Sequence, residues 1–437
     1  MSERGSHTFD VLIVGAGPAG IAAASAAAES GATVGIVDDN PGPGGQIWRG
    51  LPANENVAPK SGHDGEQSEW HARLQRARVK HFYGTRIVAQ GSPEILIAET
   101  YEETFTLEYK KLILATGARE RFLPFPGWTL PGVMGAGGWQ SLVKSGCLAL
   151  GNNIRVVIAG SGPLLLAIGA FVRKMDPAHR PQLVMIAEQA PRSRIQRFAL
   201  RLLGHGKKLL QATQLRMALA DVPYRMGTWP VRAGGTGKLE WVEMTNGRKT
   251  WRVACDYLAC GFHLVPNTEL AELLGCELRG GFVRVDELQE TTAANIFCAG
   301  EPVGIGGVET ALIEGQIAGY AATGKPESAR GLLQKRAAAR RFAALLEETF
   351  ALREELRELP APDTFVCRCE DVTFDRLTKR SGWRDAKLHT RCGMGPCQGR
   401  VCGPAAEFLF GWKVDSVRPP IFPARVESLA MIGSAKE

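Results

Sequence analysis

Five cysteines near the C-terminal end of this sequence have the spacing of metal ligands. Cys367 and Cys369 form a C-x-C pair, and Cys397 and Cys402 form a C-x4-C pair. Four thiolates are the usual ligands of [2Fe–2S] and [4Fe–4S] centres, so the two pairs predict a small iron–sulfur cluster. Cys392 precedes Cys397 by the same spacing and is the alternate ligand. Zinc also accepts four thiolates and is the main alternative, although C-x-C is unusual in zinc sites.

A second motif lies at the other end of the chain, where G-A-G-P-A-G follows an apolar, strand-like segment. In this G-x-G-x-x-G pattern, Gly15 permits a tight turn, Gly17 lets the backbone approach a pyrophosphate, and Gly20 lets helix and strand pack closely. The alanine-rich helix that follows would direct its first N–H groups at the phosphates. An acid at the end of the next strand can bind a ribose diol. We therefore predict a dinucleotide site that includes Gly15, Gly17, Pro18, Ala19, Gly20, Asp38 and Asp39.

Two later segments favour FAD as this dinucleotide. A-T-G-A, which begins at Ala115, and I-F-C-A-G-E, which ends at Glu301, each follow a strand-like run. They resemble the second and third FAD contacts of flavoproteins with the glutathione-reductase-like fold. That fold more often has Asp at the position of Glu301 and Glu at the position of Asp38. The shorter acid at Asp38 leaves room for another adenine nucleotide instead.

A second glycine-rich turn, G-S-G-P-L-L, begins another β-α-β unit just after Ile154. Leu165 occupies the position of the third glycine, where its side chain would push the helix from the strand and narrow the pyrophosphate seat. Glu188 could still bind a ribose. The motif leaves two interpretations, an NAD(P) site or a retained fold whose site has decayed, and the missing glycine favours the second.

The order of these units predicts an α/β protein with two Rossmann-like dinucleotide-binding domains, one interrupting the other, and a small C-terminal iron–sulfur domain. The predicted boundaries are residues 1–125 and 285–330 for a discontinuous FAD-binding domain, 150–260 for a degenerate NAD(P)-like domain, 331–360 for a helical linker, 361–415 for the [2Fe–2S] domain, and 416–437 for an extended tail.

Composition narrows the possible functions. The chain has 437 residues, a charged content of 22% and a formal net charge of +7. We find no basic stripe with a nucleic-acid motif. The densest basic run, Lys335 to Arg341, is expected to be a solvated face of a long helix from Leu332 to Leu356. No apolar run reaches the ~18 residues that span a bilayer and no cleavable signal is present, so we expect a cytoplasmic protein, with peripheral membrane association left open.

The sequence nominates no catalytic residue. No nucleophile–base set, histidine metal pattern or redox-active C-x-x-C pair is present. The other cysteines lie in apolar contexts and are expected to be buried, reduced side chains. These are Cys147, Cys255, Cys260, Cys276 and Cys298.

The cysteine motifs C-R-C-E-D-V-T and G-M-G-P-C-Q-G-R-V-C resemble the bacterioferritin-associated-ferredoxin-like [2Fe–2S] domain. Here they follow a glutathione-reductase-like flavoprotein that carries P-G-G-Q-I-W from Pro43 to Trp48. This order is similar to one subunit of the heteromeric amino-acid dehydrogenases, a family that includes opine oxidase, hydrogen cyanide synthase, hydroxyproline dehydrogenase and dye-linked proline dehydrogenase. The nucleotide region also resembles the α subunit of heterotetrameric sarcosine oxidase. The resemblance covers nearly the whole chain.

The resemblance implies a division of labour between subunits. A partner resembling D-amino-acid oxidase would oxidise a C–N bond with its own FAD, and electrons would pass between that partner and this chain through an FMN at the interface and the cluster. A small ferredoxin-like subunit could join the hetero-oligomer. The amine, of the opine, hydroxyproline, proline or glycine type, stays open. The family pattern places FAD contacts at Gly45, Gln46, Ile47, Ile87, Ala115, Thr116, Gly117, Gly300, Glu301, Gly307 and Val308, besides the first glycine turn and its ribose acid.

Two other functions remain as alternatives. A self-contained NAD(P)H-dependent flavoprotein reductase is disfavoured by Leu165 and by the missing C-x-x-C pair. A zinc-stabilised nucleotide-binding scaffold that is not an enzyme would be colourless as purified. The sequence therefore favours an electron-transfer subunit of an amino-acid dehydrogenase complex.

Overall fold

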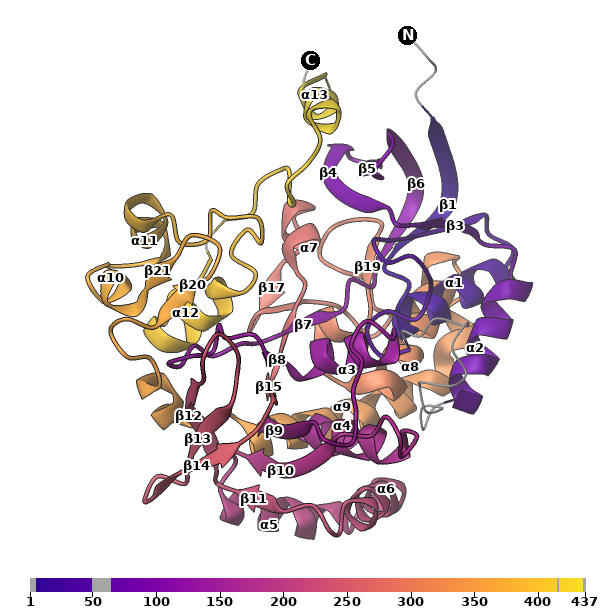
Figure 1. Ribbon diagram of the computed structural model, residues 1–437. Coiled ribbons are helices and arrows are strands. Elements are labelled where there is room, and N and C mark those ends of the chain that lie inside the picture. The colour runs from indigo at the N-terminus through magenta and orange to yellow at the C-terminus, as the bar shows by residue number, and fades with distance from the viewer. Residues whose placement is uncertain (1–4, 49–63, 415, 435–437) are drawn as a thin grey trace.

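A computed structural model describes residues 5–48, 64–414 and 416–434 of the chain (Figure 1). Two sheets with parallel strands at their centres form the body of the molecule, and a small cysteine-rich module lies beside them at the left of the view. This architecture confirms the predicted fold class, two Rossmann-like units followed by a small C-terminal module.

The first sheet gathers strands from both ends of the first unit. Its strand order is β3-β2-β1-β6-β5-β4, and β19 pairs with the last residues of β6. Five of its strands are parallel, so their carboxyl ends meet at one edge, while β4 and β5 are antiparallel. The strands are β1 (Ser6–Val14), β2 (Val34–Asp38), β3 (Lys80–Tyr83), β4 (Arg86–Ser92), β5 (Ile95–Glu99), β6 (Thr104–Leu114) and β19 (Ile296–Cys298).

Two helices begin near the carboxyl ends of strands in this sheet, and they pack tightly against each other. They are α1 (Pro18–Glu29), after β1, and α8 (Gly307–Ala322), after β19 and the short η1 (Glu301–Val303). A Cβ at Gly315 would collide with the Ala19 carbonyl oxygen, so glycine in α8 allows this close approach. Helix α2 (Asp64–Arg76) packs on the other side of α1. The polar sequence of residues 52–69 predicts a segment with little structure. Most of it lies outside the described residues, but α2 already begins within it.

The second unit repeats the parallel pattern. Its sheet has the order β11-β10-β9-β15-β8, all parallel, and a separate antiparallel sheet β12-β13-β14 packs beside it. Short strands β7 (Ala118–Glu120) and β16 (Leu264–Pro266) pair with each other where the chain enters and leaves the unit. The remaining elements of the second unit are β8 (Val133–Gly135), α3 (Ala136–Lys144), β9 (Arg155–Ser161), α4 (Leu164–Lys174), β10 (Gln182–Glu188), α5 (Arg192–Leu202), α6 (Gly206–Ala218), β11 (Tyr224–Met226), β12 (Trp229–Gly234), β13 (Trp241–Thr245), β14 (Thr250–Ala254) and β15 (Tyr257–Phe262). The chain then forms α7 (Glu269–Leu273), β17 (Leu278–Arg279) and β18 (Phe282–Val283), which pack against the core of the first sheet.

The helix predicted from Leu332 to Leu356 ends earlier than expected. After η2 (Pro326–Ala329), helix α9 spans Arg330–Phe350, and a separate η3 covers Glu354–Glu358. The Phe350 carbonyl accepts hydrogen bonds from the side chains of Ser161 and Gln189 and contacts the His263 ring at 2.6 Å, instead of receiving an N–H from a further helical turn. The tertiary contacts of the second unit therefore end the helix.

The expectation that Lys335 to Arg341 forms a solvated face was wrong for two of its arginines. Arg336 and Arg340 turn inward and form ion pairs with the wholly buried Glu314 of α8, at 3.5 and 2.6 Å. A buried carboxylate needs such partners because its desolvation is costly. These two guanidinium groups therefore do not belong to a solvated face of α9.

The C-terminal module is small and closes with a tail that returns to the first sheet. The tail was expected to be extended, but it ends in a helix, α13, which packs on β4 and β5. Cys147 was expected to be buried and is exposed, whereas Cys255, Cys260, Cys276 and Cys298 are buried. Among the described helices, none has both the length and the hydrophobicity for a membrane crossing. The elements are β20 (Phe365–Cys367), β21 (Val372–Thr373), α10 (Phe374–Thr378), α11 (Trp383–Thr390), α12 (Cys402–Phe410) and α13 (Val426–Ser434).

Candidate functional site

The first glycine turn has the geometry of a phosphate cradle. Gly15 has φ +107°, and a Cβ there would collide with the Ala115 carbonyl oxygen. A Cβ at Gly20 would collide with the Gly15 carbonyl oxygen, so this glycine lets α1 start directly behind β1. Gly17 precedes α1, and Pro18 is its first residue, a position where the missing N–H costs nothing. The free N–H groups of the first turn of α1 can therefore face an anion.

The predicted ribose acid lies beside this turn. Asp38 ends β2, is buried, and accepts hydrogen bonds from the backbone N–H of Ala16 and from the backbone and side chain of Asn40. Gly45 crosses the turn so closely that a Cβ there would lie 2.9 Å from the Gly17 Cα. The segments around Gly15, Asp38 and Gly45 thus meet at one place, as a shared dinucleotide site requires.

The second and third predicted FAD segments, which follow β6 and β19, lie at the same carboxyl edge of the first sheet. The Ala115 N–H donates to the Val14 carbonyl at 2.8 Å, and Thr116 is fixed by Asn267, whose side chain donates to the Thr116 carbonyl at 2.8 Å. Gly300 has φ +82° and donates its N–H to Glu314 at 3.1 Å. Asn267 and Glu314 were not predicted, although Asn267 ends the V-P-N stretch after β15, at the crossing between the two units.

The Glu301 side chain is oriented toward the start of α8. Its two carboxylate oxygens accept the N–H groups of Gly306 and Gly307, at 3.1 and 3.0 Å, where α8 begins. Burial raises the pKa of this carboxyl, although the two N–H groups oppose that shift. Glu301 therefore orders the Gly300–Gly307 segment, and its predicted contact with the ribityl chain stays a prediction.

The remaining predicted FAD residues occupy different environments. Gln46 and Ile47 are exposed, and Gln46 faces the cavity described below. Ile87 is buried in the core beneath β1 and β2, while Val308 packs against the core that holds α1. Asp39 is exposed next to Asn40. Their contacts with a flavin nucleotide remain predictions.

The cysteines of the C-terminal module come together. The sulfurs of Cys367, Cys392 and Cys402 all lie within 4.8 Å of one another and are buried. Cys397 contacts Cys402 and Cys369 through its sulfur. This group holds Cys367 and Cys402 of the predicted four ligands together with the alternate Cys392, and it does not include Cys369 or Cys397. Which four cysteines bind a cluster remains a prediction. A soft, all-thiolate donor set of this kind fits an iron–sulfur cluster and also zinc.

The closely spaced thiols shift one another's pKa in opposite directions. Hydrogen bonds from Cys392 and Cys402 hold the pKa of Cys367 well below its usual range, aided by the N–H groups of Gly393 and Glu370. The same contacts raise the pKa of Cys402. Backbone N–H groups that point at sulfur are typical of cluster sites, where they also tune the reduction potential.

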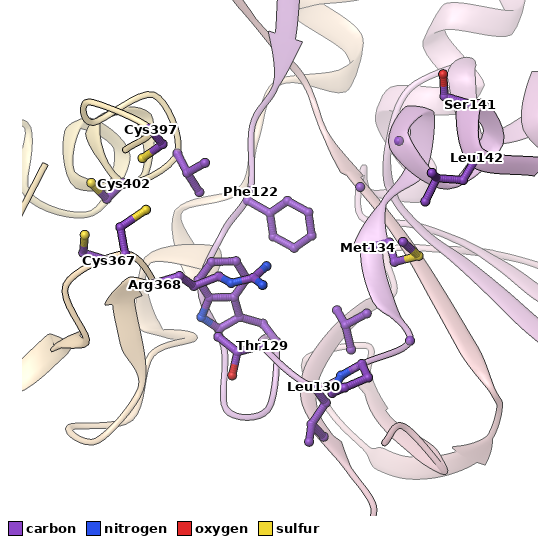
Figure 2. A pocket seen from close by; sticks show the side chains of 18 of the residues that line it. Phe122, Thr129, Leu130, Met134, Ser141, Leu142, Cys367, Arg368, Cys397 and Cys402 are labelled. Atoms are coloured by element: carbon purple, nitrogen blue, oxygen red, sulfur yellow. The ribbon is translucent and has the colours of Figure 1, made fainter. Parts of the chain in front are cut away.

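A cavity of about 850 Å³ lies between the cysteines and the loop that contains Gln46, which we call the flavin loop. Figure 2 shows Cys367, Cys397 and Cys402 on one side of it and Ser141 and Leu142 of α3 on the other. Arg368, between two predicted ligands, reaches into the cavity and lies 5.6 Å from the Trp128 ring centroid. The lining is mainly apolar, and among the described residues no His, Asp, Glu or Lys contributes to it.

A set of arginines that the sequence did not single out joins the cysteine module to the first unit. Arg119 of β7 donates to the Arg400 carbonyl at 3.1 Å, and both guanidinium groups contact Glu269, at 2.9 and 3.8 Å. Arg400 also lies 3.9 Å from the Phe422 ring centroid, with Arg86 4.9 Å from that ring. Arg400 stands between Cys397 and Cys402, so these contacts fix the cluster loop relative to the flavin unit.

The second glycine turn has a different environment. Ser161 donates to the Phe350 carbonyl at 2.7 Å, and a Cβ at Gly162 would lie 4.0 Å from the Phe350 ring. Glu188 is wholly buried and accepts the Gly162 N–H at 2.7 Å. Leu165 is buried in the core behind the turn. The end of α9 therefore packs against the turn where a second dinucleotide would need to approach, and the decay of this site stays a prediction.

Known proteins are similar to this chain in sequence and in fold. Residues 9–318 match the pyridine nucleotide-disulphide oxidoreductase family. One subunit of the opine oxidase of Agrobacterium tumefaciens (strain Ach5) is 30% identical, over 97% of this chain and 92% of the relative. The hydrogen cyanide synthase subunit HcnB of Pseudomonas aeruginosa is 32% identical, over 90% of each chain. The crystal structure of L-proline dehydrogenase from P. horikoshii has the same fold, with a TM-score of 0.66 and 19% identity over 98% of this chain and 81% of that one.

The chain therefore belongs to the pyridine nucleotide-disulphide oxidoreductase family and, within it, to the group that contains HcnB and the opine oxidase subunit. It is an oxidoreductase, and its family implies FAD. The first glycine turn fits that nucleotide, because Gly17 leaves the backbone open to a pyrophosphate, while Gly15 and Gly20 let the strand, the turn and the helix pack without a side chain between them. The heteromeric family inferred from the sequence motifs is thus confirmed.

Proposed function

We propose that this chain is the electron-transfer subunit, with FAD and a [2Fe–2S] cluster, of a heteromeric amino-acid dehydrogenase. The shared cavity carries the proposal, since Gln46 of the flavin loop and four cysteines of the C-terminal module line the same space. FAD supplies two-electron chemistry when bound, and an iron–sulfur cluster supplies one-electron steps. The protein's part is to hold the two near each other, which the contacts of Arg400 and Arg119 support.

The substrate chemistry is assigned to another subunit. Among the described residues, the cavity has no carboxylate, histidine or lysine that could take a proton from an amine. Two relatives are named as subunits, of opine oxidase and of hydrogen cyanide synthase. We therefore place oxidation of the C–N bond, of an opine, hydroxyproline, proline or glycine type, in a D-amino-acid-oxidase-like partner, with a ferredoxin-like protein as a further subunit.

The same cavity supports an FMN between the subunits. Its volume lies in the range of small-molecule and cofactor sites. Its apolar walls suit a flavin ring, and Arg368 offers a cation for a phosphate. We place the assembled complex in the cytoplasm.

Amine-driven reduction of the native complex tests this function. The complex is purified from its host and mixed anaerobically with each candidate amine, while flavin absorbance and the electron paramagnetic resonance of iron are followed. One amine should bleach the flavin and produce an iron signal in the complex but not in the isolated chain. An isolated chain that oxidises the amine, or that NADH reduces rapidly, would contradict the proposal. A colourless chain with stoichiometric zinc would support the scaffold instead.

A further inference from the structure

One hairpin of the second unit concentrates the positive charge of the whole chain. From Gln189 to Ala220 the sequence contains seven Lys and Arg residues and no Asp or Glu, and the formal net charge of the chain is +7. The segment forms α5, a short connection and α6, at the lower edge of Figure 1, away from the cysteine module. Charge elsewhere in the chain balances to zero, so the net charge of the chain equals the charge of this segment.

The hairpin also exposes large apolar side chains along its outer side. Leu200, Leu203, Leu210 and Met217 are 69, 66, 60 and 72% exposed. Leu200 and Leu203 are three residues apart, and Leu210 and Met217 are seven apart, so each pair lies on one helical face. Two contacts on the inner side explain how the hairpin is held: Phe198 packs on Phe350, and His205 packs on Phe342 of α9.

Acidic neighbours neutralise only part of the charge. Arg201 pairs with Glu348 and Lys208 pairs with Glu309, both at 2.7 Å. Arg197 and Lys207 are exposed and form no ion pair within the described residues. Exposed leucines flanked by unpaired cations match an anionic bilayer, where apolar groups enter the interface and cations contact headgroups.

From this combination we infer that the α5–α6 hairpin binds this chain peripherally to anionic phospholipid membranes. Both halves of the surface have a counterpart in that partner: headgroups for Arg197 and Lys207, and the acyl boundary for Leu200, Leu203, Leu210 and Met217. An acidic protein surface would match the charge alone, whereas an anionic bilayer also matches the four exposed apolar side chains. The inference goes beyond the proposed function and does not depend on any bound cofactor.

Vesicle sedimentation of the full-length chain tests the inference. The probes are vesicles of phosphatidylcholine alone and of phosphatidylcholine mixed with phosphatidylglycerol, at low and high salt. The chain should sediment with the anionic vesicles only and be released by salt. R197E and K207E should each weaken binding about fivefold or more, and the pair L200S and L203S should weaken it further. L388S, at a residue 71% exposed on α11, is the matched control and should bind normally.

Two results overturn the inference. One is that the chain ignores anionic vesicles, or that the hairpin variants sediment like the parent. The other is that the variants lose their association with the purified partner protein while vesicle binding is absent, which would make the hairpin a protein interface. Far-UV circular dichroism of each variant, compared with the parent, ensures that a loss of binding is not a loss of fold.

Discussion

The two glycine-rich turns of this chain have closely similar sequences and very different surroundings. At the first, the segments around Asp38, Gly45 and Gly300 converge on an open turn. At the second, Ser161 holds the Phe350 carbonyl at the end of a helix that comes from far along the chain. The comparison teaches that a glycine motif determines the conformation of the turn, whereas segments distant in the sequence determine what packs against that turn.

The largest expected effect on cofactor content is at the first turn. Gly17 has φ −75°, and a Cβ there would lie 3.9 Å from the Gly45 Cα, so Gly17→Ala should fold normally. The added methyl group would meet a pyrophosphate, and we expect FAD affinity to fall at least about tenfold. Flavin per chain after dialysis measures this. Gly331→Ala, which adds a methyl group to open space, is the control. Full FAD retention in Gly17→Ala would show that the nucleotide does not use this turn.

The next effect concerns the ion pair behind the first site. Arg340→Ala would leave Glu314 buried with only the more distant Arg336, and we expect a loss of about 3–5 kcal/mol in unfolding free energy. Arg341→Ala, at the exposed neighbouring position, should change stability by less than about 0.5 kcal/mol. Denaturant unfolding of both variants checks the prediction. Equal stabilities would mean that Glu314 is not held by Arg340.

A smaller effect concerns Glu188, the buried acid beside the second turn. Burial raises the pKa of Glu188 to about 7. The unfolded chain therefore loses this proton first as the pH rises from about 4.5 to about 7, so stability is greatest below that range and falls across it, by at most about 3 kcal/mol. Glu188→Gln removes this contribution. Between about pH 5 and about pH 8, the unfolding free energy of the variant should fall less than that of the parent, and parallel pH profiles would contradict the assignment.

The smallest effect is at the contact that closes the second turn. Ser161→Ala removes one hydrogen bond to the Phe350 carbonyl, while Gln189 still donates to it. We expect a loss of about 0.5–1.5 kcal/mol and no gain of NADH-driven flavin reduction. Ser193→Ala, at an exposed position on α5, is the control. Rapid bleaching by NADH in Ser161→Ala would show that the second turn is a latent nucleotide site.

Local patterns predicted the elements of the fold well, for physical reasons. Buried parallel strands such as Val11 to Val14 read as apolar runs, and Gly15 and Gly20 are required where a Cβ would strike the backbone. The cysteine spacing likewise predicted a thiol cluster, which the positions of Cys367 and Cys402 support.

Long-range contacts could not be predicted from those patterns. The end of α9 depends on Ser161 and His263, which belong to the second unit, and the inward turn of Arg340 depends on Glu314. The cavity likewise exists only because the cysteine module docks against Trp128, whose indole N–H donates to the Phe365 carbonyl at 2.6 Å. Such pairings join residues that no sequence window contains together.

The central claim is that this chain carries a flavin and an iron–sulfur cluster on either side of one cavity. Its most direct test is the electron paramagnetic resonance of the anaerobically purified chain after dithionite reduction, with acid extraction of flavin from the same sample. The account predicts an iron signal and about one FAD per chain, and loss of the signal in Cys367→Ser with the flavin retained. A chain that yields neither an iron signal nor extractable flavin would contradict it.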